Sequence, residues 1–321
     1  MYDSGDAASV VASGGGWRVA GSNTFGTSPG GTATRYPPPA TPISIVICTR
    51  NRPALLRRCL ASIAAGTTLP LEVVVSDDGD DAAAVCAAFA FSRRVTGPRR
   101  GIGANRRYGA AAARAPYVSF LDDDVVVPAS FVARLATLAA RAENSGGRTI
   151  YSGVVVDGDE VVRPSNQTFW GHFGAPVPPG GPLENLNLCA NLVPAAAFRV
   201  ATFDERLFCY EDADFCAQAR AAGFRVELDD ALTTTHLPVE RAPYSRHLTR
   251  CRFYATLKRH LLVERRPLRA LAYLVLAPLH QAAHHARRGE WRAVPTVVRD
   301  LALALGDLRA AVSERRAKGV A

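Results

Sequence analysis

Ile43-Ser44-Ile45-Val46-Ile47 is an apolar run in which four of the five residues are β-branched. Such a run is typical of a strand that is buried on both faces of a parallel sheet. Arg52-Pro53 then opens a helical pattern, because the apolar residues that follow recur at spacings of three and four. These residues are Leu55, Leu56, Cys59, Leu60 and Ile63. We therefore expect order to begin at this strand and a helix to follow it directly.

Strands and helices continue to alternate up to the acidic triplet Asp122-Asp123-Asp124. Strands are predicted at 71–75, near Arg94-Val95 and at 117–121, and alanine-rich helices at 82–90 and 103–114. Alternation at this spacing is typical of βαβ units. We therefore predict an α/β fold with a doubly wound, mainly parallel sheet.

Beyond residue 150 the pattern is mixed. The predicted elements are a strand pair (150–156 and 160–163), a loop rich in Pro, Gly and Asn (164–187), a helix (212–222) ended by Gly223, and helices from residue 244 onward that are separated at Pro267 and Pro295. The last region, 241–321, is predicted to be helical and amphipathic.

The two ends of the chain differ from its middle in composition. Residues 1–40 are rich in Gly, Ser, Thr, Ala and Pro without apolar periodicity, so they are predicted to be a disordered leader. From residue 241 onward 17 Lys and Arg face 5 Asp and Glu, an excess of +12, which leaves −3 for the rest of a chain of net charge +9. Basic amphipathic helices can lie on an anionic membrane. A helical cap on the preceding domain is the alternative.

Cysteine usage and apolar runs bear on the compartment. The seven cysteines are scattered and never spaced as CxxC, which favours neither a disulfide framework nor a zinc module. The N-terminus lacks the basic-then-apolar order of a secretory signal. No apolar run reaches the roughly 18–20 residues needed to span a bilayer. We expect a cytoplasmic protein, with peripheral attachment to the inner membrane face as an open alternative.

Three predicted strands end in polar residues: Cys48-Thr49-Arg50-Asn51 after the first, Asp77-Asp78 after the second and Asp122-Asp123-Asp124 after the fourth. Ligands of open α/β sheets bind beyond the carboxyl ends of the strands. Consecutive carboxylates repel one another unless a cation or water compensates them. Mg²⁺ or Mn²⁺ would bridge them to the diphosphate of a nucleotide. A solvated acidic loop is the alternative.

Five segments carry a family resemblance: SIVICTRNR (44–52), EVVVSDDG (72–79), FLDDD (120–124), FDE (203–205) and YEDADF (210–215). In this order and spacing they closely resemble glycosyltransferase family 2, whose fold is of the GT-A type. The resemblance extends over about residues 43–240, and we expect a GT-A catalytic domain at 41–240.

The resemblance implies a role for each matching residue. Cys48, Thr49, Arg50 and Asp123 would line the donor site, and Asp78 would accept a hydrogen bond from the base ring. Arg106 would face the donor phosphates, where a guanidinium fork suits phosphate oxygens. Two positions depart from the family pattern, because Arg50 replaces a common aromatic residue and Arg107 replaces a common asparagine.

The resemblance also implies a metal site and a base. Asp122, Asp124 and His236 would hold Mn²⁺ or Mg²⁺, with Asp124 as the more direct ligand. Asp212 would deprotonate the acceptor hydroxyl, with Glu211 beside it. Three simpler roles stay open, because Asp78 could cap a helix, Glu211 could be an ion-pair partner and His236 could lie there without a metal ion.

Acceptor contacts are expected from the loop at 167–173, through Trp170 and His172, and from Asn191. Aromatic rings in such a loop can stack on a sugar or an apolar acceptor. Ordinary packing of the loop is the alternative.

Together these features predict an inverting, metal-dependent hexosyl- or deoxyhexosyltransferase that uses a UDP-, dTDP- or GDP-sugar. The acceptor stays open among glycans, lipid-linked sugars and natural products, and no nucleic-acid partner is expected. A sugar-nucleotide pyrophosphorylase is the first alternative, but it would need a Gly-rich loop and a lysine near the first strand. A catalytically inactive, basic membrane-binding module is the second, and it would have no use for the acidic motifs.

Overall fold

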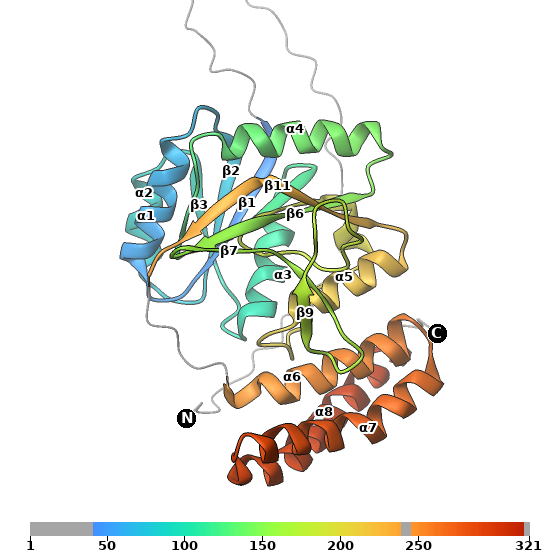
Figure 1. Cartoon of the computed structure of the whole chain (residues 1–321). Helices are drawn as coiled ribbons and strands as arrows, with labels where there is room; N and C mark the ends of the chain where they lie inside the picture. The colour runs from blue at the N-terminus through green and yellow to red at the C-terminus, as the bar shows by residue number, and fades with distance from the viewer. Residues whose placement is uncertain (1–40, 239–244, 318–321) are drawn as a thin grey trace, which may run out of the picture. The chain divides into compact units, whose positions relative to one another are not determined.

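The computed structural model describes residues 41–238 and 245–317 (Figure 1). The predicted disordered leader at 1–40 lies outside these residues. The strands are β1 (Thr41–Thr49), β2 (Pro70–Asp77), β3 (Ser92–Thr96), β4 (Tyr117–Asp122), β5 (Val125–Val126), β6 (Thr149–Asp157), β7 (Glu160–Val162), β8 (Ser165–Gln167), β9 (Phe173–Pro176), β10 (Asn191–Pro194) and β11 (Arg225–His236). The helices are α1 (Pro53–Ala64), α2 (Ala82–Ala87), α3 (Ile102–Ala112), α4 (Phe131–Asn144), α5 (Glu211–Ala221), α6 (Ser245–Lys258), α7 (Pro267–Arg287) and α8 (Val294–Ala317), with 3₁₀ turns η1 (Ala195–Arg199) and η3 (Trp291–Ala293) and a π-helical turn η2 (Arg259–Val263).

The main sheet has the strand order β3-β2-β1-β4-β10-β6-β11-β5, with β7 paired to β6. β1 is parallel to both of its neighbours, β2 and β4, and β2 is parallel to β3. β10 runs antiparallel between β4 and β6, while β11 is parallel to β6. The predicted α/β fold with a mainly parallel sheet is therefore confirmed. Parallel pairing of β2, β1 and β4 places their carboxyl ends at one edge of the sheet.

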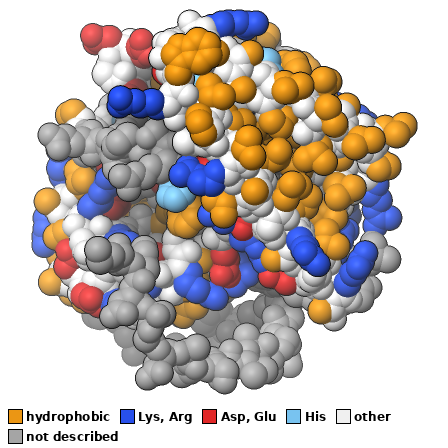
Figure 2. Space-filling view, turned by 90° about the horizontal axis from the view of Figure 1, so that it is seen from below, with side chains coloured by type: hydrophobic (Ala, Val, Ile, Leu, Met, Phe, Trp, Pro, Cys, Tyr) orange, Lys and Arg blue, Asp and Glu red, His pale blue; other side chains and the backbone are white. Residues whose placement is uncertain are grey.

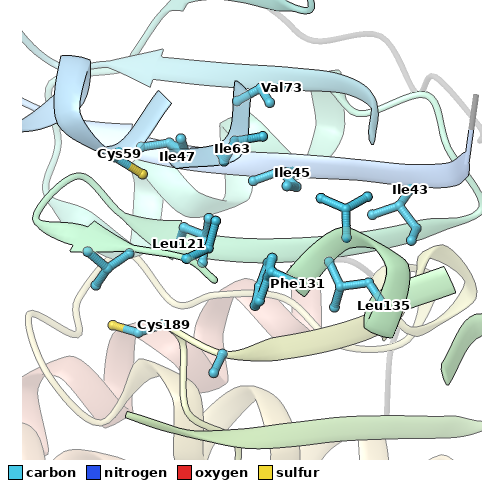
Figure 3. Packing of buried hydrophobic residues seen from close by; sticks show 14 of the residues in the cluster. Ile43, Ile45, Ile47, Cys59, Ile63, Val73, Leu121, Phe131, Leu135 and Cys189 are labelled. Carbon is cyan, nitrogen blue, oxygen red and sulfur yellow. The ribbon is translucent and has the colours of Figure 1, made fainter. Parts of the chain in front are cut away.

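Helices cover both faces of the sheet, as a doubly wound fold requires. Side chains alternate along β1, so Ile45 and Ile47 pack toward α1, α2 and α4 while Val46 and Cys48 pack toward α3 and α5. Figure 3 shows Ile45 and Leu121 facing Phe131 of α4. A run such as Ile43–Ile47 is apolar at nearly every position because both faces are covered.

The C-terminal helices α6, α7 and α8 form a third hydrophobic cluster around Tyr254, Tyr273 and Val297, and this cluster also includes Leu207 and Tyr210 from the segment before α5. Pro267 is the first residue of α7 and Pro295 is the second of α8, so both prolines separate helices as predicted. Pro278 lies inside α7 and does not end it. In the part of the chain that the structure describes, no helix combines the length and the apolar character needed to cross a membrane.

Several elements differ from the sequence expectations. The loop expected at 164–187 contains the hairpin β8–β9, with Gln167 opposite Phe173. The helix expected at 82–90 ends at Ala87. The elements that were not predicted include α4, β5, β10 and β11. β11 carries Asp229, whose carboxylate is buried against Arg134 of α4, so a charge interrupts the apolar pattern of a strand.

Candidate active site

Glycine places helix α3 unusually close to the sheet. A Cβ atom on Gly109 would lie 2.6 Å from Val46 Cγ1, and one on Gly103 would lie 2.5 Å from the Asp204 carbonyl oxygen. Larger residues at these positions would push α3 away from the strand and from the FDE segment. Arg106 lies between the two glycines, so its guanidinium is held directly beneath the strand ends.

Arg106 is buried and joins two of the acidic motifs. Its Nη2 donates to Asp122 Oδ1 at 2.8 Å, and its Nη1 donates to Glu211 Oε1. Burial opposes ionisation of Asp122, but the charge of Arg106 and the thiol of Cys189 outweigh it and lower the pKa of that carboxyl. Burial also opposes the charge of Arg106, yet the carboxylates of Asp122 and Glu211 raise its pKa. The ion-pair role left open for Glu211 is thus present, and the contact of Arg106 with phosphates stays a prediction.

Arg52, at the start of α1, compensates the other two carboxylates of the triplet. Its Nη1 donates to Asp123 Oδ1 at 2.9 Å and to Asp124 Oδ2 at 3.2 Å. The Thr49 hydroxyl donates to Asp123 Oδ2 at 2.6 Å. Burial still raises the pKa of Asp123 against these contacts. The triplet is therefore compensated by Arg52 and Arg106, so guanidinium groups of the protein itself are cations that the triplet requires.

His236 reaches the acidic triplet through β5 and β11. The two strands pair antiparallel, with His236 opposite Val125, and the Leu237 N–H donates to the Asp124 carbonyl oxygen at 2.8 Å. His236 Nδ1 consequently lies 3.6 Å from Asp124 Oδ1. This nitrogen is buried and has no hydrogen-bond partner among the described residues.

These contacts test whether a divalent ion fits here. His236 Nδ1, which has no hydrogen-bond partner among the described residues, and the neighbouring Asp124 Oδ1 can both serve as metal ligands. Ions such as Mg²⁺ commonly use one or two protein ligands together with substrate phosphates. Both oxygens of Asp122, by contrast, are occupied by Arg106 and Cys189. No group of three His, Cys, Asp or Glu residues in the described ranges forms a complete metal site. Asp124 and His236 therefore fit a metal ion that also takes ligands from a substrate. Asp122, which was expected as a third ligand, instead binds Arg106 and Cys189.

Glu211 and Asp212 open α5, so their side chains diverge by about 100°. Tyr210 precedes them with a φ of 68°, a left-handed conformation that turns the chain sharply into the helix. Glu211 is buried beside Arg106, whereas Asp212 stays partly exposed. Asp212 Oδ1 accepts from the Ala213 N–H at 2.8 Å, and Oδ2 lies 3.4 Å from Asn185 Nδ2.

The environment makes both of these carboxyls more basic than usual. Burial raises the pKa of Glu211 to about 7, with Arg106 opposing the rise and Asp212 adding to it. Burial also raises the pKa of Asp212, against the Ala213 N–H and the charge of Arg106. An accessible carboxylate of raised basicity is suited to accept a proton.

Three further residues, Asp78, Cys48 and Arg50, were predicted to line the donor site. Asp78 is buried and its Oδ1 accepts from the Arg99 N–H at 2.9 Å, while burial raises the pKa of its carboxyl. Among the described residues it is Asp77, and not Asp78, whose carboxylate reaches the first N–H of α2, at Ala82. Cys48 is buried in the sheet, and Arg50 is exposed. Their contacts with a donor stay predictions.

The structure separates the predicted acceptor residues. Asn191 is fully buried, and its amide accepts from the Phe120 N–H and donates to the carbonyl oxygens of Phe120 and Asn187. It ties β10 to β4, and its complete burial leaves no surface for contact with an acceptor, which corrects that expectation. Trp170 stacks on His280 at 4.2 Å, and His172 Nδ1 lies 3.1 Å from Arg252 Nη1. Both side chains therefore pack against the C-terminal helices, as the alternative expected, and their contact with a sugar acceptor stays a prediction.

Two acidic residues of the family motifs are bound by a helix that sequence reasoning did not connect to them. Lys258 of α6 lies 2.7 Å from both Asp204 and Asp214, and the Tyr254 hydroxyl donates to Asp204 at 2.5 Å. Lys258 therefore anchors α6 against the FDE segment and helix α5. The sequence does not indicate that Lys258 contacts Asp204 and Asp214, because the fold alone brings these three residues together.

Comparisons with known proteins give a match to one sequence family and several solved structures of similar fold. Residues 44–189 match the family model described as glycosyl transferase family 2. A search of curated proteins gives no match. The crystal structure of S. aureus TarS 1–349 in complex with UDP-GlcNAc has a TM-score of 0.53 at 16% identity, covering 87% of this chain and 88% of that one.

Two further solved structures share the fold. A longer S. aureus TarS chain has a TM-score of 0.50 at 16% identity, covering 78% of this chain and 54% of that one, so this chain spans about half of its length. GalNAc-T7 with UDP, GalNAc and Mn²⁺ has a TM-score of 0.51 at 15% identity, over 64% of this chain and 45% of that one. Residues 44–189 therefore match glycosyl transferase family 2, on a mainly parallel α/β fold of the GT-A type.

Proposed function

We propose that this protein transfers a sugar from a nucleotide-diphosphate sugar to an acceptor hydroxyl with inversion at the anomeric carbon. The observation that carries the proposal is the pair at the start of α5, where Glu211 is held by Arg106 and Asp212 is left accessible with a raised pKa. The crystal structure of TarS 1–349, which shares the fold, contains UDP-GlcNAc. This supports the donor class.

In the proposed reaction Asp212 accepts the proton of the acceptor hydroxyl while the hydroxyl oxygen forms a bond to the anomeric carbon. The bond between that carbon and the distal phosphate oxygen breaks, and the nucleoside diphosphate leaves with the electron pair. Asn185, which lies 3.4 Å from Asp212 Oδ2, helps to orient the carboxylate. Glu211 keeps Arg106 in place between α5 and the strand ends.

Asp124 and His236 would hold a divalent ion, Mn²⁺ or Mg²⁺. When bound, such an ion neutralises the charge of the diphosphate and makes it a better leaving group. The orphaned Nδ1 of His236 supports this assignment, as does the Mn²⁺ in the GalNAc-T7 structure. Arg52 holds Asp123 and one oxygen of Asp124, which leaves the other oxygen directed toward His236.

A donor screen tests the reaction class. UDP-, dTDP- and GDP-sugars are incubated with the protein, with and without Mn²⁺, and release of the nucleoside diphosphate is measured. We expect release from one nucleotide class, accelerated by Mn²⁺ and slowed by about 10²–10⁴-fold in Asp212→Asn. Formation of a nucleoside triphosphate from pyrophosphate and a nucleotide sugar would instead indicate a pyrophosphorylase.

A second function is favoured by the surface of the C-terminal helices, and we infer that it binds an anionic membrane. Figure 2 shows apolar side chains gathered on this face, with Lys and Arg side chains at its margins. On α7 the side chains of Leu268, Leu271, Val275 and Leu279 are 82%, 58%, 55% and 65% exposed. Their spacings of three and four place them on one side of the helix.

The charges around this apolar surface favour a bilayer over a second copy of the chain. All five acidic residues at 245–317 are in ion pairs, with partners that include His260, Arg206 and Arg250. The same residues contain 15 Lys and Arg, so this region is strongly positive and two such surfaces would repel each other. Anionic lipid headgroups would complement the arginines while the leucines enter the interface.

Cosedimentation with vesicles tests this surface. We expect binding to vesicles that contain phosphatidylglycerol, weakening with salt, and little binding to phosphatidylcholine alone. Leu271→Glu/Leu279→Glu should lose binding. Val161→Glu/Val162→Glu on β7, where the native residues are 57% and 43% exposed, is the matched control and should keep it. Equal binding by both double variants, or dimer formation that Leu271→Glu/Leu279→Glu abolishes, would contradict the membrane assignment.

A further inference from the structure

Cys189 lies directly before β10, between the acidic triplet and the last residue of β11. Its Sγ is 3.1 Å from Asp122 Oδ2 and 3.6 Å from His236 Nε2. The side chain is 5% exposed, and the loop that carries it is fixed because the Cys189 N–H donates to Asn187 Oδ1. Figure 3 shows Cys189 on its loop beyond Leu121.

The position of the thiol proton follows from these two neighbours. Asp122 Oδ2 is a carboxylate oxygen that can only accept, so at 3.1 Å it accepts the single S–H of Cys189. Because its one proton is used in this bond, the sulfur can only accept a hydrogen bond from His236.

Since only an Nε2–H can donate to the sulfur, this contact favours the neutral His236 tautomer that carries its proton on Nε2 and a lone pair on Nδ1. That lone pair lies 3.6 Å from Asp124 Oδ1 and has no donor among the described residues. Two lone pairs facing each other in a buried site favour a cation between them.

We infer that Cys189 is a positioning residue that fixes the His236 tautomer and so presents Nδ1 to the divalent ion. The inference rests on the proposed metal site, but it concerns the protein's own hydrogen bonds and can be tested without catalysis. Second-shell partners of a ligating histidine commonly fix its ring in this way, and removing one costs about 10–100-fold in metal affinity.

Two measurements test it. In ¹⁵N-histidine-labelled, metal-free protein at alkaline pH, the His236 resonances, assigned with His236→Gln, should show the Nε2–H tautomer. Cys189→Ala should show a mixture of tautomers, and Cys189→Ser, which keeps a donor and an acceptor, should restore the single form. Mn²⁺ affinity, followed by electron paramagnetic resonance in the presence of nucleoside diphosphate, should fall about 10–100-fold in Cys189→Ala. Cys86→Ala, in α2, is the matched control for loss of a buried thiol and should change neither result.

The outcomes separate this inference from the proposed function. An Nδ1–H tautomer in the wild type, or an unchanged tautomer and Mn²⁺ affinity in Cys189→Ala, would overturn the role of Cys189. If the wild-type protein has the Nε2–H tautomer but binds no Mn²⁺, the metal site is wrong, and so is the inference that Cys189 presents His236 Nδ1 to a metal ion. In that case donor turnover without added metal would still support sugar transfer.

Discussion

Replacing Lys258 by methionine removes the one cation that lies against both Asp204 and Asp214 in the described structure. Lys258 Nζ is 2.7 Å from each carboxylate, and its side chain is only 12% exposed. Methionine keeps most of the side-chain volume, so the change acts mainly on charge. The variant is left with two buried carboxylates at the contact between α5, the FDE segment and α6.

The size of the effect follows from the partners that remain. Removing one member of a buried ion pair costs about 3–5 kcal/mol. Asp204 still accepts from the Tyr254 hydroxyl and from Arg206. Asp214 keeps only the Gln218 amide on one oxygen, and its other oxygen has no partner in the described residues. We therefore expect a loss near the lower end, about 3 kcal/mol at neutral pH.

The loss should depend on pH with a defined sign. Burial opposes ionisation of Asp204, but Lys258 and the Tyr254 hydroxyl outweigh it and lower its pKa to about 2. An unfolded aspartate titrates near about 3.9, so this stabilisation is present above that pH and is lost as the pH falls toward 2. The difference between wild type and Lys258→Met should shrink correspondingly below about pH 4.

Urea unfolding followed by circular dichroism measures the effect. Adding Asp214→Asn to Lys258→Met should recover part of the loss, because it removes an uncompensated charge. The exposed Arg292→Met on η3 is the control and should change stability by less than about 0.5 kcal/mol. A loss below about 1 kcal/mol in Lys258→Met, or no recovery in the double variant, would refute the reasoning that this pair is buried and anchors α6.

The remaining predictions concern the active site. Asp212→Asn should lower kcat by about 10²–10⁴-fold with donor binding unchanged, whereas Glu211→Gln should lower it less, and steady-state kinetics with one acceptor distinguish the two. Asp124→Asn should abolish Mn²⁺-dependent nucleotide binding by calorimetry, and full activity in excess chelator would count against the ion. Since burial raises the pKa of Glu211 to about 7, its contribution to stability is present at low pH and lost as the pH rises through 7. The unfolding free energy of the wild type should fall between pH 5 and 7 more steeply than that of Glu211→Gln, and parallel curves would argue against the raised pKa.

The strands that carry the acidic motifs were predictable because their pattern is local. Ile43–Ile47 is apolar since helices cover both faces, and Asp122 follows β4 directly. β10 was missed because it has only four residues, and β11 because Asp229 breaks its apolar pattern. Short strands and compensated charges leave little periodicity to detect.

The chemistry of the site was predictable in its residue types but not in its contacts. Glu211 and Asp212 follow from the motif, yet only the fold shows that Arg106 takes one and leaves the other accessible. Arg52, Cys189 and Lys258 act across long sequence separations, so no local pattern marks them. Asn191 was misassigned because an asparagine in sequence does not reveal that its amide is used up by the backbone of β4.

The central claim is that Asp212 drives a single displacement, and the configuration of the first product tests it most directly. Once the screen has identified an α-linked donor, its turnover is followed by time-resolved proton NMR, with water or a competent acceptor as the attacking hydroxyl. The account predicts that the β-anomer forms first and that Asp212→Asn lowers its rate of formation by about 10²–10⁴-fold. Initial formation of the α-anomer, or undiminished turnover in Asp212→Asn, would contradict it.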